Sequence, residues 1–174
     1  MKASVFIATS LDGFIARENG DLDWLPGGDV EDHGYDAFMT TVDTIVMGRG
    51  TYEKVLTFGD WAFGEMPVVV LTSKPETLPA LPAPTVTMMS GTPHEVVDAL
   101  RARGAKSLYV DGGVTVQRFL AAGLIQRLVI TRVPVLLGSG RPLFGAIGHD
   151  VPLRHVTSRA FDSGLVQSEY EVVA

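Results

Sequence analysis

The sequence of 174 residues predicts an α/β fold, in which helices flank a mainly parallel central sheet and an antiparallel hairpin forms the C-terminal edge. The first observation behind this prediction is an alternation along the chain. Short apolar, β-branched runs are followed by segments whose apolar residues recur every three or four positions. The second is a hairpin signal, Asp162-Ser163-Gly164, between two final apolar runs. We expect residues 1–174 to form one domain, since chains of this length commonly build a single core.

The predicted strands are short apolar runs bounded by turn residues. They are residues 5–8, 14–16, 44–47, 67–71, 86–89, 108–110, 128–131, 154–161 and 165–173. Helices are predicted between residues 29 and 41, after Thr51 and Thr92 as N-caps, and around residues 116–120. Proline-rich residues 75–84 are a predicted surface connector.

Composition excludes several classes of function. The net charge of −6 argues against a broad surface for nucleic acid or an anionic membrane, because both require clustered Lys and Arg. The chain has no cysteine, which excludes disulfides, thiolate catalysis and cysteine-based zinc sites. The first apolar run ends at Ser10, well short of signal-peptide or membrane-span length. We therefore expect a cytoplasmic protein that binds neither nucleic acid nor membrane.

Familiar catalytic and nucleotide-binding motifs are missing. The four histidines, at positions 33, 94, 149 and 155, have no metal-ligand spacing, so no metal site is predicted. Neither G-x-G-x-x-G nor G-x-x-x-x-G-K-[ST] occurs, which disfavours a standard Rossmann site and a P-loop. Ser10 and Ser73 lack the G-x-S-x-G setting of an esterase nucleophile.

Three turns follow predicted strands and carry the residues suited to phosphate binding. They are Gly48-Arg49-Gly50-Thr51, Leu71-Thr72-Ser73-Lys74 and Gly112-Gly113-Val114-Thr115. Such turns share the carboxyl edge of an open α/β sheet, where ligands bind. Glycines let phosphate oxygens approach the backbone, and a helix N-terminus favours negative charge. This predicts a pyrophosphate site, with hydroxyl donors at the second turn for another phosphate.

The motifs together resemble the dihydrofolate reductase superfamily. They are residues 8–16 (ATSLDGFIA), residues 45–53 (IVMGRGTYE) and residues 110–113 (VDGG). Residues 10–16 and the Leu137-Gly138-Ser139-Gly140 motif make the chain more similar to the reductase domain of the bifunctional deaminase-reductase of riboflavin biosynthesis. The resemblance covers nearly the whole chain. The chain lacks the zinc motif of the fused deaminase domain, so we expect a free-standing member of the family.

The resemblance implies a dihydrofolate reductase-like fold and an NADPH-dependent oxidoreductase. Hydride would pass to a small heterocyclic or sugar-derived substrate, as in 5-amino-6-(5-phosphoribosylamino)uracil reductase. The implied cofactor-binding residues are Ala8, Thr9, Ile15, Gly20, Gly48, Arg49, Gly50, Thr51, Leu71, Thr72, Ser73, Gly112, Gly113, Val114, Thr115 and Val116. Residues 19–24 resemble the loop that closes over nicotinamide in folate reductases.

The substrate side is less defined. The implied substrate-binding residues are Ser10, Asp12, Trp24, Leu137, Gly138 and Gly140. A folate reductase uses one carboxylate of the first helix, for which Asp29, Glu31, Asp32 and Asp36 compete. Spacing from Met47 favours Asp32 as the catalytic carboxylate, with Asp36 next. The candidates for binding a substrate phosphate are Arg132, Arg141 and Arg154.

Two other functions stay open: dihydrofolate reduction, and a non-catalytic NADPH-binding module. A homodimer is expected in either case, because the apolar C-terminal hairpin would otherwise leave an exposed sheet edge. Substrate-dependent oxidation of NADPH separates the enzyme from the module.

Overall fold

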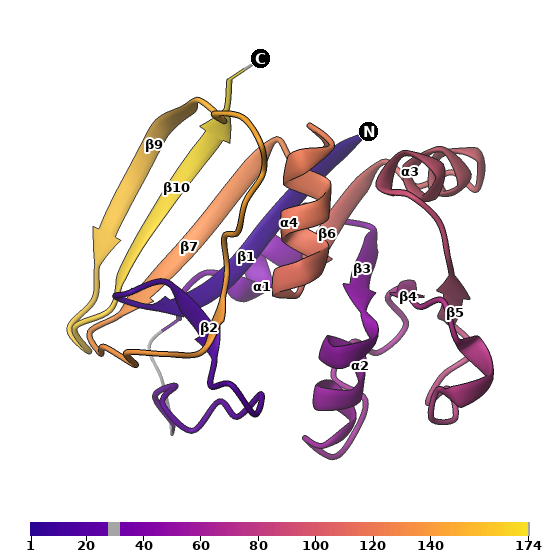
Figure 1. Ribbon diagram of the computed structural model, residues 1–174, viewed down its shortest axis with the longest axis horizontal. Helices are drawn as coiled ribbons and strands as arrows, with labels where there is room; N and C mark the ends of the chain where they lie inside the picture. The colour runs from indigo at the N-terminus through magenta and orange to yellow at the C-terminus, as the bar shows by residue number, and fades with distance from the viewer. Residues whose placement is uncertain (28–31, 174) are drawn as a thin grey trace.

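An eight-stranded sheet forms the centre of the computed structural model, which describes residues 1–27 and 32–173 (Figure 1). Its strands run in the order β5-β4-β3-β6-β1-β7-β10-β9, and β2 pairs with β8 separately. The strands are β1 (Lys2–Ser10), β2 (Phe14–Ala16), β3 (Thr44–Gly48), β4 (Val68–Leu71), β5 (Val86–Met89), β6 (Ser107–Asp111), β7 (Arg127–Val133), β8 (Arg141–Pro142), β9 (Leu153–Ala160) and β10 (Val166–Val172). The helices are α1 (Tyr35–Met39), α2 (Arg49–Leu56), α3 (Pro93–Ala102) and α4 (Gly113–Ala121), with a 3₁₀ turn η1 (Pro75–Thr77).

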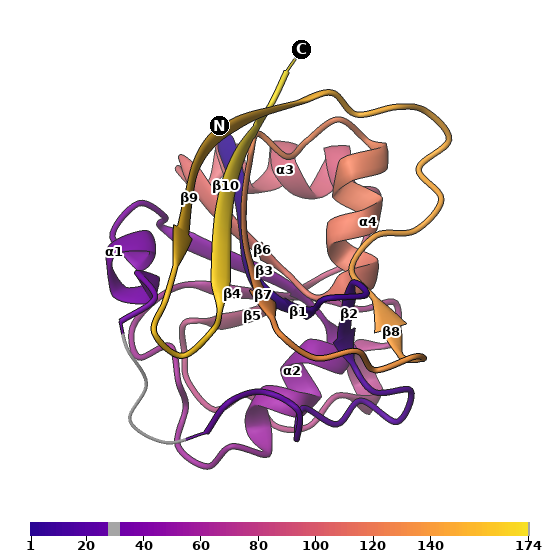
Figure 2. The same cartoon turned by 90° about the vertical axis from the view of Figure 1, so that its left-hand side faces the viewer.

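The sheet is mainly parallel. Every pairing from β5 through β7 is parallel, whereas β7 with β10 and β10 with β9 are antiparallel. The predicted α/β class and the C-terminal hairpin are therefore confirmed. The hairpin forms one edge of the sheet, beside β7 (Figure 2).

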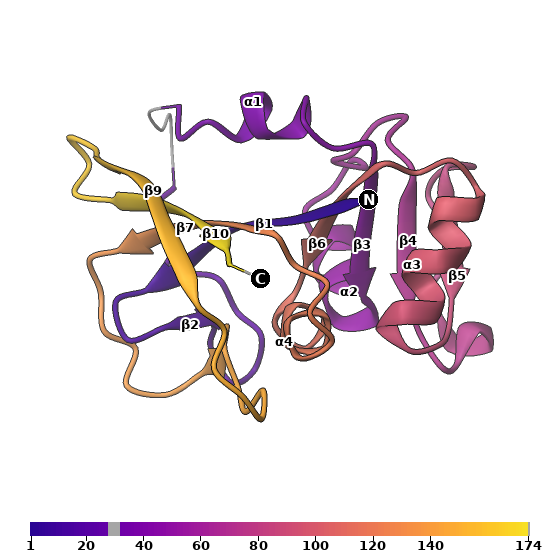
Figure 3. The same cartoon turned by 90° about the horizontal axis from the view of Figure 1, so that it is seen from above.

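Two layers of helices cover the two faces of the sheet. Val46 of β3 joins the core cluster that contains the apolar faces of α3 and α4. Its neighbours Ile45 and Met47 join a second cluster, with Phe38 of α1 and Tyr52 of α2. This alternation, buried on both sides, is typical of a parallel strand between helix layers. Figure 3 shows α1 on one side of the sheet and α4 on the other.

Local signals account for where the helices start. Thr92 and Glu95 form a capping box at the start of α3, as the sequence predicts. The helix predicted between residues 29 and 41 is confined to Tyr35–Met39. Gly34 precedes this helix with a φ of 81°, and the Gly34 N–H donates to the Asp32 carboxylate, so Asp32 lies before the helix.

Among the described residues, no helix is long and apolar enough to cross a membrane.

The edge strand β9 is exposed along its whole length. All eight of its residues are exposed, including Leu153 and Val156, while its only partner strand within the sheet is β10. A Phe161 N–H to Leu165 carbonyl bond of 2.9 Å closes the turn between the two strands. The strand leaves one row of backbone groups unpaired within this sheet.

Candidate functional site

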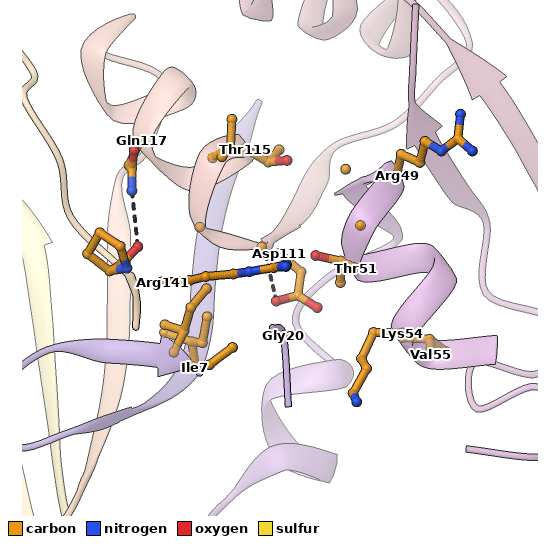
Figure 4. Close-up of a pocket in the computed structure, with 18 of the residues that line it drawn as sticks. Ile7, Gly20, Arg49, Thr51, Lys54, Val55, Asp111, Thr115, Gln117 and Arg141 are labelled. Carbon is orange, nitrogen blue, oxygen red and sulfur yellow. Dashed lines mark hydrogen bonds between the residues drawn. The ribbon is translucent and has the colours of Figure 1, made fainter. Parts of the chain in front are cut away.

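A cavity of about 800 Å³ opens at the carboxyl ends of the parallel strands (Figure 4). It reaches from Leu71, at the end of β4, to Ala8 near the end of β1. The turns that lead from β3 into α2 and from β6 into α4 lie between these limits. In a parallel sheet the carboxyl edge is where ligands bind, so this cavity is the candidate site.

Two of the three predicted phosphate-binding turns line this cavity, and the third reaches it only through Leu71. Residues 48–51 and 112–115 line it directly, and Leu71 represents the turn after β4. They converge because β3 pairs with β4 on one side and with β6 on the other, all in parallel. Thr72 and Ser73 continue from Leu71 without lining the cavity.

Glycine is required where the two helix N-termini approach each other. Gly112 has a φ of 92°, and a Cβ there would overlap Thr51 Oγ1. A Cβ on Gly48 would lie 2.9 Å from Thr115 Oγ1, and one on Gly113 would lie 2.9 Å from Ile15 Cδ1. The backbone of these turns is therefore bare toward the cavity, as a site for phosphate oxygens requires.

A carboxyl group whose pKa is raised lies in the middle of the cavity wall. Asp111 ends β6 and lines the cavity. Desolvation raises its pKa from 3.8 to about 6, against the effect of the Gly112 N–H, which donates to it at 2.8 Å. Burial also raises the pKa of Tyr109 well above 10, and the Asp111 charge adds to it. Tyr109 donates its hydroxyl proton to the Phe6 carbonyl at 2.9 Å. Burial therefore keeps the Asp111 carboxyl protonated to a higher pH than an exposed aspartate.

Two arginines of the cavity wall are held in place by neighbours. Arg49 donates to the Glu53 carboxylate at 2.7 Å and to the Thr77 carbonyl at 3.0 Å. The Arg141 guanidinium lies against Gly20, where an added Cβ would be 3.3 Å from it. Of the three arginines considered for a substrate phosphate, Arg141 lines the cavity; Arg132 does not, and Arg154 pairs with Glu171.

Ser10 and Asp12 hold a loop and do not line the cavity. The Ser10 hydroxyl donates to Asp12 at 2.6 Å. The Asp12 carboxylate accepts the N–H groups of Leu137 at 3.1 Å and Gly138 at 2.8 Å. These bonds hold the pKa of Asp12 below its usual value, with the Ser10 bond the largest cause. They join the two motifs, residues 10–13 and 137–140, that resemble the riboflavin-biosynthesis reductases.

The implied catalytic carboxylates also lie elsewhere. Asp32 is bonded to Gly34, Asp36 is exposed on α1, and neither lines the cavity. Asp29 and Glu31 lie outside the described residues. Trp24 packs against Val133, Phe161 and Leu165, and its indole N–H has no hydrogen-bond partner in the part of the chain that the structure describes.

The remaining site predictions divide into two groups. The implied binding residues that line the cavity are Ala8, Ile15, Gly20, Gly48, Arg49, Gly50, Thr51, Leu71, Gly112, Gly113, Val114, Thr115 and Gly140. Those that do not are Thr9, Thr72, Ser73, Val116, Ser10, Asp12, Trp24, Leu137 and Gly138. The lining residues that the sequence analysis did not assign include Leu22, Leu25, Lys54, Val55, Phe58, Asp111 and Gln117. Asp111 carries one usable signal, a carboxylate between a buried strand and a glycine turn.

Comparison with known proteins gives relatives over the full length. The chain is 35% identical over 173 residues to the uncharacterized protein YwjB of Bacillus subtilis (strain 168), covering 97% of each. It is 40% identical to a protein of Shewanella sp. PV-4 provisionally named as a riboflavin biosynthesis protein. That crystal structure superposes with a TM-score of 0.89 over 100% of both chains.

More distant structures share the fold. A dihydrofolate reductase from Enterococcus faecalis, in complex with NADP(H), is 19% identical, with a TM-score of 0.69 over 99% of this chain and 97% of that one. This likeness confirms the dihydrofolate reductase-like fold predicted from the sequence. A deaminase and 5-amino-6-(5-phosphoribosylamino)uracil reductase from Thermotoga maritima is 16% identical, with a TM-score of 0.70, and the match covers 56% of it. The RibD C-terminal domain model matches residues 2–167. The chain therefore belongs to the RibD C-terminal domain family, as its sequence motifs indicate.

Proposed function

We propose that this protein is an NADPH-dependent reductase that passes a hydride to a small heterocyclic or sugar-derived substrate. The observation that carries the proposal is that the turns at residues 48–51 and 112–115 line one cavity together with Leu71, and that glycines let these two turns pack closely. Membership of a family of reductase domains supports it. NADPH carries a pyrophosphate and a separate phosphate on its adenosine half, which suits turns that come from different strands of the sheet.

The cavity residues fit this cofactor in chain order. Residues 48–51 and 112–115 would hold the pyrophosphate through backbone N–H groups at the N-termini of α2 and α4. Arg49 and Leu71, both in the cavity lining, would border the adenosine half. Ala8, Ile15 and Gly20 would border the nicotinamide.

The chain's own residues would then complete the reduction. Bound NADPH supplies a hydride from its nicotinamide ring. The wall formed by Ala8 and Ile15 orients the acceptor carbon and excludes water. Asp111 would donate its proton to the acceptor heteroatom and would be reprotonated by water. Desolvation keeps this carboxyl protonated to a higher pH than an ordinary aspartate, as a proton donor requires.

Cofactor binding is tested by thermal unfolding with and without NADPH. At a concentration of 100 times Kd, the ligand adds about 2.7 kcal/mol to the free energy of unfolding. For a chain of this size that corresponds to a rise in Tm of about 5–10 °C. Gly113→Ala, whose Cβ would lie 3.0 Å from the Pro142 carbonyl oxygen, should weaken binding at least about tenfold. Gly27→Ala, in open space, is the control. A melting curve unmoved by NADPH would contradict the proposal.

The alternatives give different results in one assay. A folate reductase oxidises NADPH when dihydrofolate is added, but neither Asp32 nor Asp36 lines the cavity to hold a pteridine. A non-catalytic module binds NADPH without oxidising it in the presence of pyrimidine, pteridine or carbonyl compounds. Absorbance at the reduced nicotinamide band distinguishes the three.

A further inference from the structure

Four apolar residues of the cavity lining are not assigned to binding the proposed cofactor. Leu22 and Leu25 line it from the loop after β2, and Val55 and Phe58 line it from the last turn of α2 and the residues after it. We name these four residues the acceptor end. Phe58 is 60% exposed, although it is a large apolar side chain beside a cavity. Figure 4 shows Val55 on α2, beyond Thr51 and away from Arg49.

The charges around the acceptor end are unsuited to an anion. Lys54 is the lining cation next to it, and its amino group pairs with Asp21 at 3.5 Å. On the same loop, Arg17 pairs with Asp23 at 2.6 Å. After Phe58, residues 59–73 contain Asp60 and Glu65 but no Lys or Arg. Lys54, the charged lining residue next to Val55, is therefore partly neutralised by Asp21, and Glu18, which also lines the cavity, is acidic.

The remaining cations of the cavity wall belong to the part assigned to the cofactor. Arg141 donates through Nε to the Glu18 carbonyl at 3.2 Å and packs against Gly20. The Pro142 carbonyl lies 3.0 Å from a Cβ built on Gly113, so the backbone after Arg141 adjoins the turn at residues 112–115. Arg118 follows the same turn on α4. Arg118 and the backbone after Arg141 thus adjoin the turn that would hold the pyrophosphate, and the Arg141 guanidinium adjoins Gly20, at the proposed border of the nicotinamide.

We propose that the acceptor is a neutral, planar heterocycle without a phosphate or carboxylate tail, packed against Val55 and Phe58. This inference rests on the proposed function and narrows it. The hydride would add to the carbon of a C=N bond, either in the ring or in the imine that joins the ring to a ring-opened sugar. The Asp111 proton would go to the nitrogen of that bond, and NADPH would leave as NADP⁺. The phosphoribosyl compound named for the Thermotoga maritima relative would be a poor substrate.

Matched pairs of acceptors test the charge requirement. One pair is 6-methyl-7,8-dihydropterin and dihydrofolate, which share a ring but differ in the charged tail. The other is 5-amino-6-ribosylaminouracil with and without its 5′-phosphate. NADPH oxidation should give a kcat/KM at least about tenfold higher for an uncharged member than for its charged partner, about 1.4 kcal/mol. A charged member that is preferred overturns the inference and leaves the proposed reductase standing. If NADPH binds but no acceptor is reduced, both this inference and the proposed reductase are wrong. The binding data then support only the cofactor site.

Variants of the acceptor end test its location. Phe58→Ala should raise KM for the uncharged acceptor about tenfold or more, because its ring covers the acceptor, while Kd for NADPH changes less than about twofold. Arg141→Ala should have the opposite effect: it should weaken NADPH binding and change KM for the uncharged acceptor little. Phe144→Ala is the matched control, an exposed phenylalanine outside the cavity lining. If Phe58→Ala leaves KM unchanged while circular dichroism shows a folded protein, the acceptor does not lie where we place it.

Discussion

Replacing Asp111 by Asn should change how the stability of this protein depends on pH. Desolvation raises the pKa of Asp111 from 3.8, its value in an unfolded chain, to about 6 in the folded state. The folded protein therefore binds the proton more tightly. This tighter proton binding stabilises the folded state fully below about pH 4, and the stabilisation is lost as the pH rises through about 6. Two pH units at about 1.4 kcal/mol each give a loss of about 3 kcal/mol.

Urea unfolding at several values between pH 4 and pH 8 measures this loss. The free energy of unfolding of Asp111→Asn, relative to the natural chain, should rise by about 3 kcal/mol over that range, because asparagine never ionises. Asp98→Asn, at an exposed pair with Arg101, is the control and should show no comparable trend. A constant difference between the Asp111 variant and the natural chain would refute the desolvation argument. Because we propose Asp111 as the proton donor, we also expect Asp111→Asn to lose about 10²–10⁴-fold in kcat with unchanged NADPH affinity.

Three further predictions follow from the contacts. Gly112→Ala should lower stability by about 1–3 kcal/mol and abolish NADPH binding, measured by urea unfolding and fluorescence titration. Gly104→Ala has a similar φ but open space, so it should keep the binding. Asp12→Asn should lower Tm at pH 7 because Gly138 loses its acceptor, and the two melting temperatures should converge as pH falls below 3.8. We also propose a homodimer paired through the β9 edge, for which Val156→Lys should shift the sedimentation coefficient toward that of a monomer.

Each of these predictions has an outcome that contradicts it. Equal NADPH affinity in the two glycine variants would mean that close approach of the turns is not required. If the melting temperatures of the variant and the natural chain differ equally at pH 3 and pH 7, the charge of Asp12 does not stabilise its loop. A natural chain that sediments as a monomer at all concentrations would rule out the dimer.

Sequence patterns predicted the sheet and the converging turns because both follow from local chemistry. Strands buried on both faces, such as β3, appear as continuous apolar runs. The turns at residues 48–51 and 112–115 could be placed together because parallel strands share a carboxyl edge. The glycines there are needed for backbone geometry, which can be inferred from the residue type alone.

The carboxyl group that we propose as the proton donor could not be predicted in the same way. Spacing along the chain favoured Asp32, but Gly34 shortens α1 and leaves Asp32 before its start. The raised pKa of Asp111 depends on burial between neighbouring strands, which the sequence does not display. The bonds from Asp12 to residues 125 and 126 positions away are similarly non-local. Predictions failed to locate these groups because their environment is assembled by tertiary contacts.

The two ends of the cavity differ in what holds them. Strand pairing fixes one end, since Gly48 is paired with Leu71 and Met47 with Asp111 in continuous ladders. The other end comes from loop residues and the segment between α2 and β4, which no ladder constrains. Exchanging residues 57–60, and leaving Trp61 and Phe63 packed against the core, should therefore change which acceptor the proposed reductase takes, while its proposed binding of the dinucleotide persists. The scaffold is suited to directed evolution confined to that short stretch.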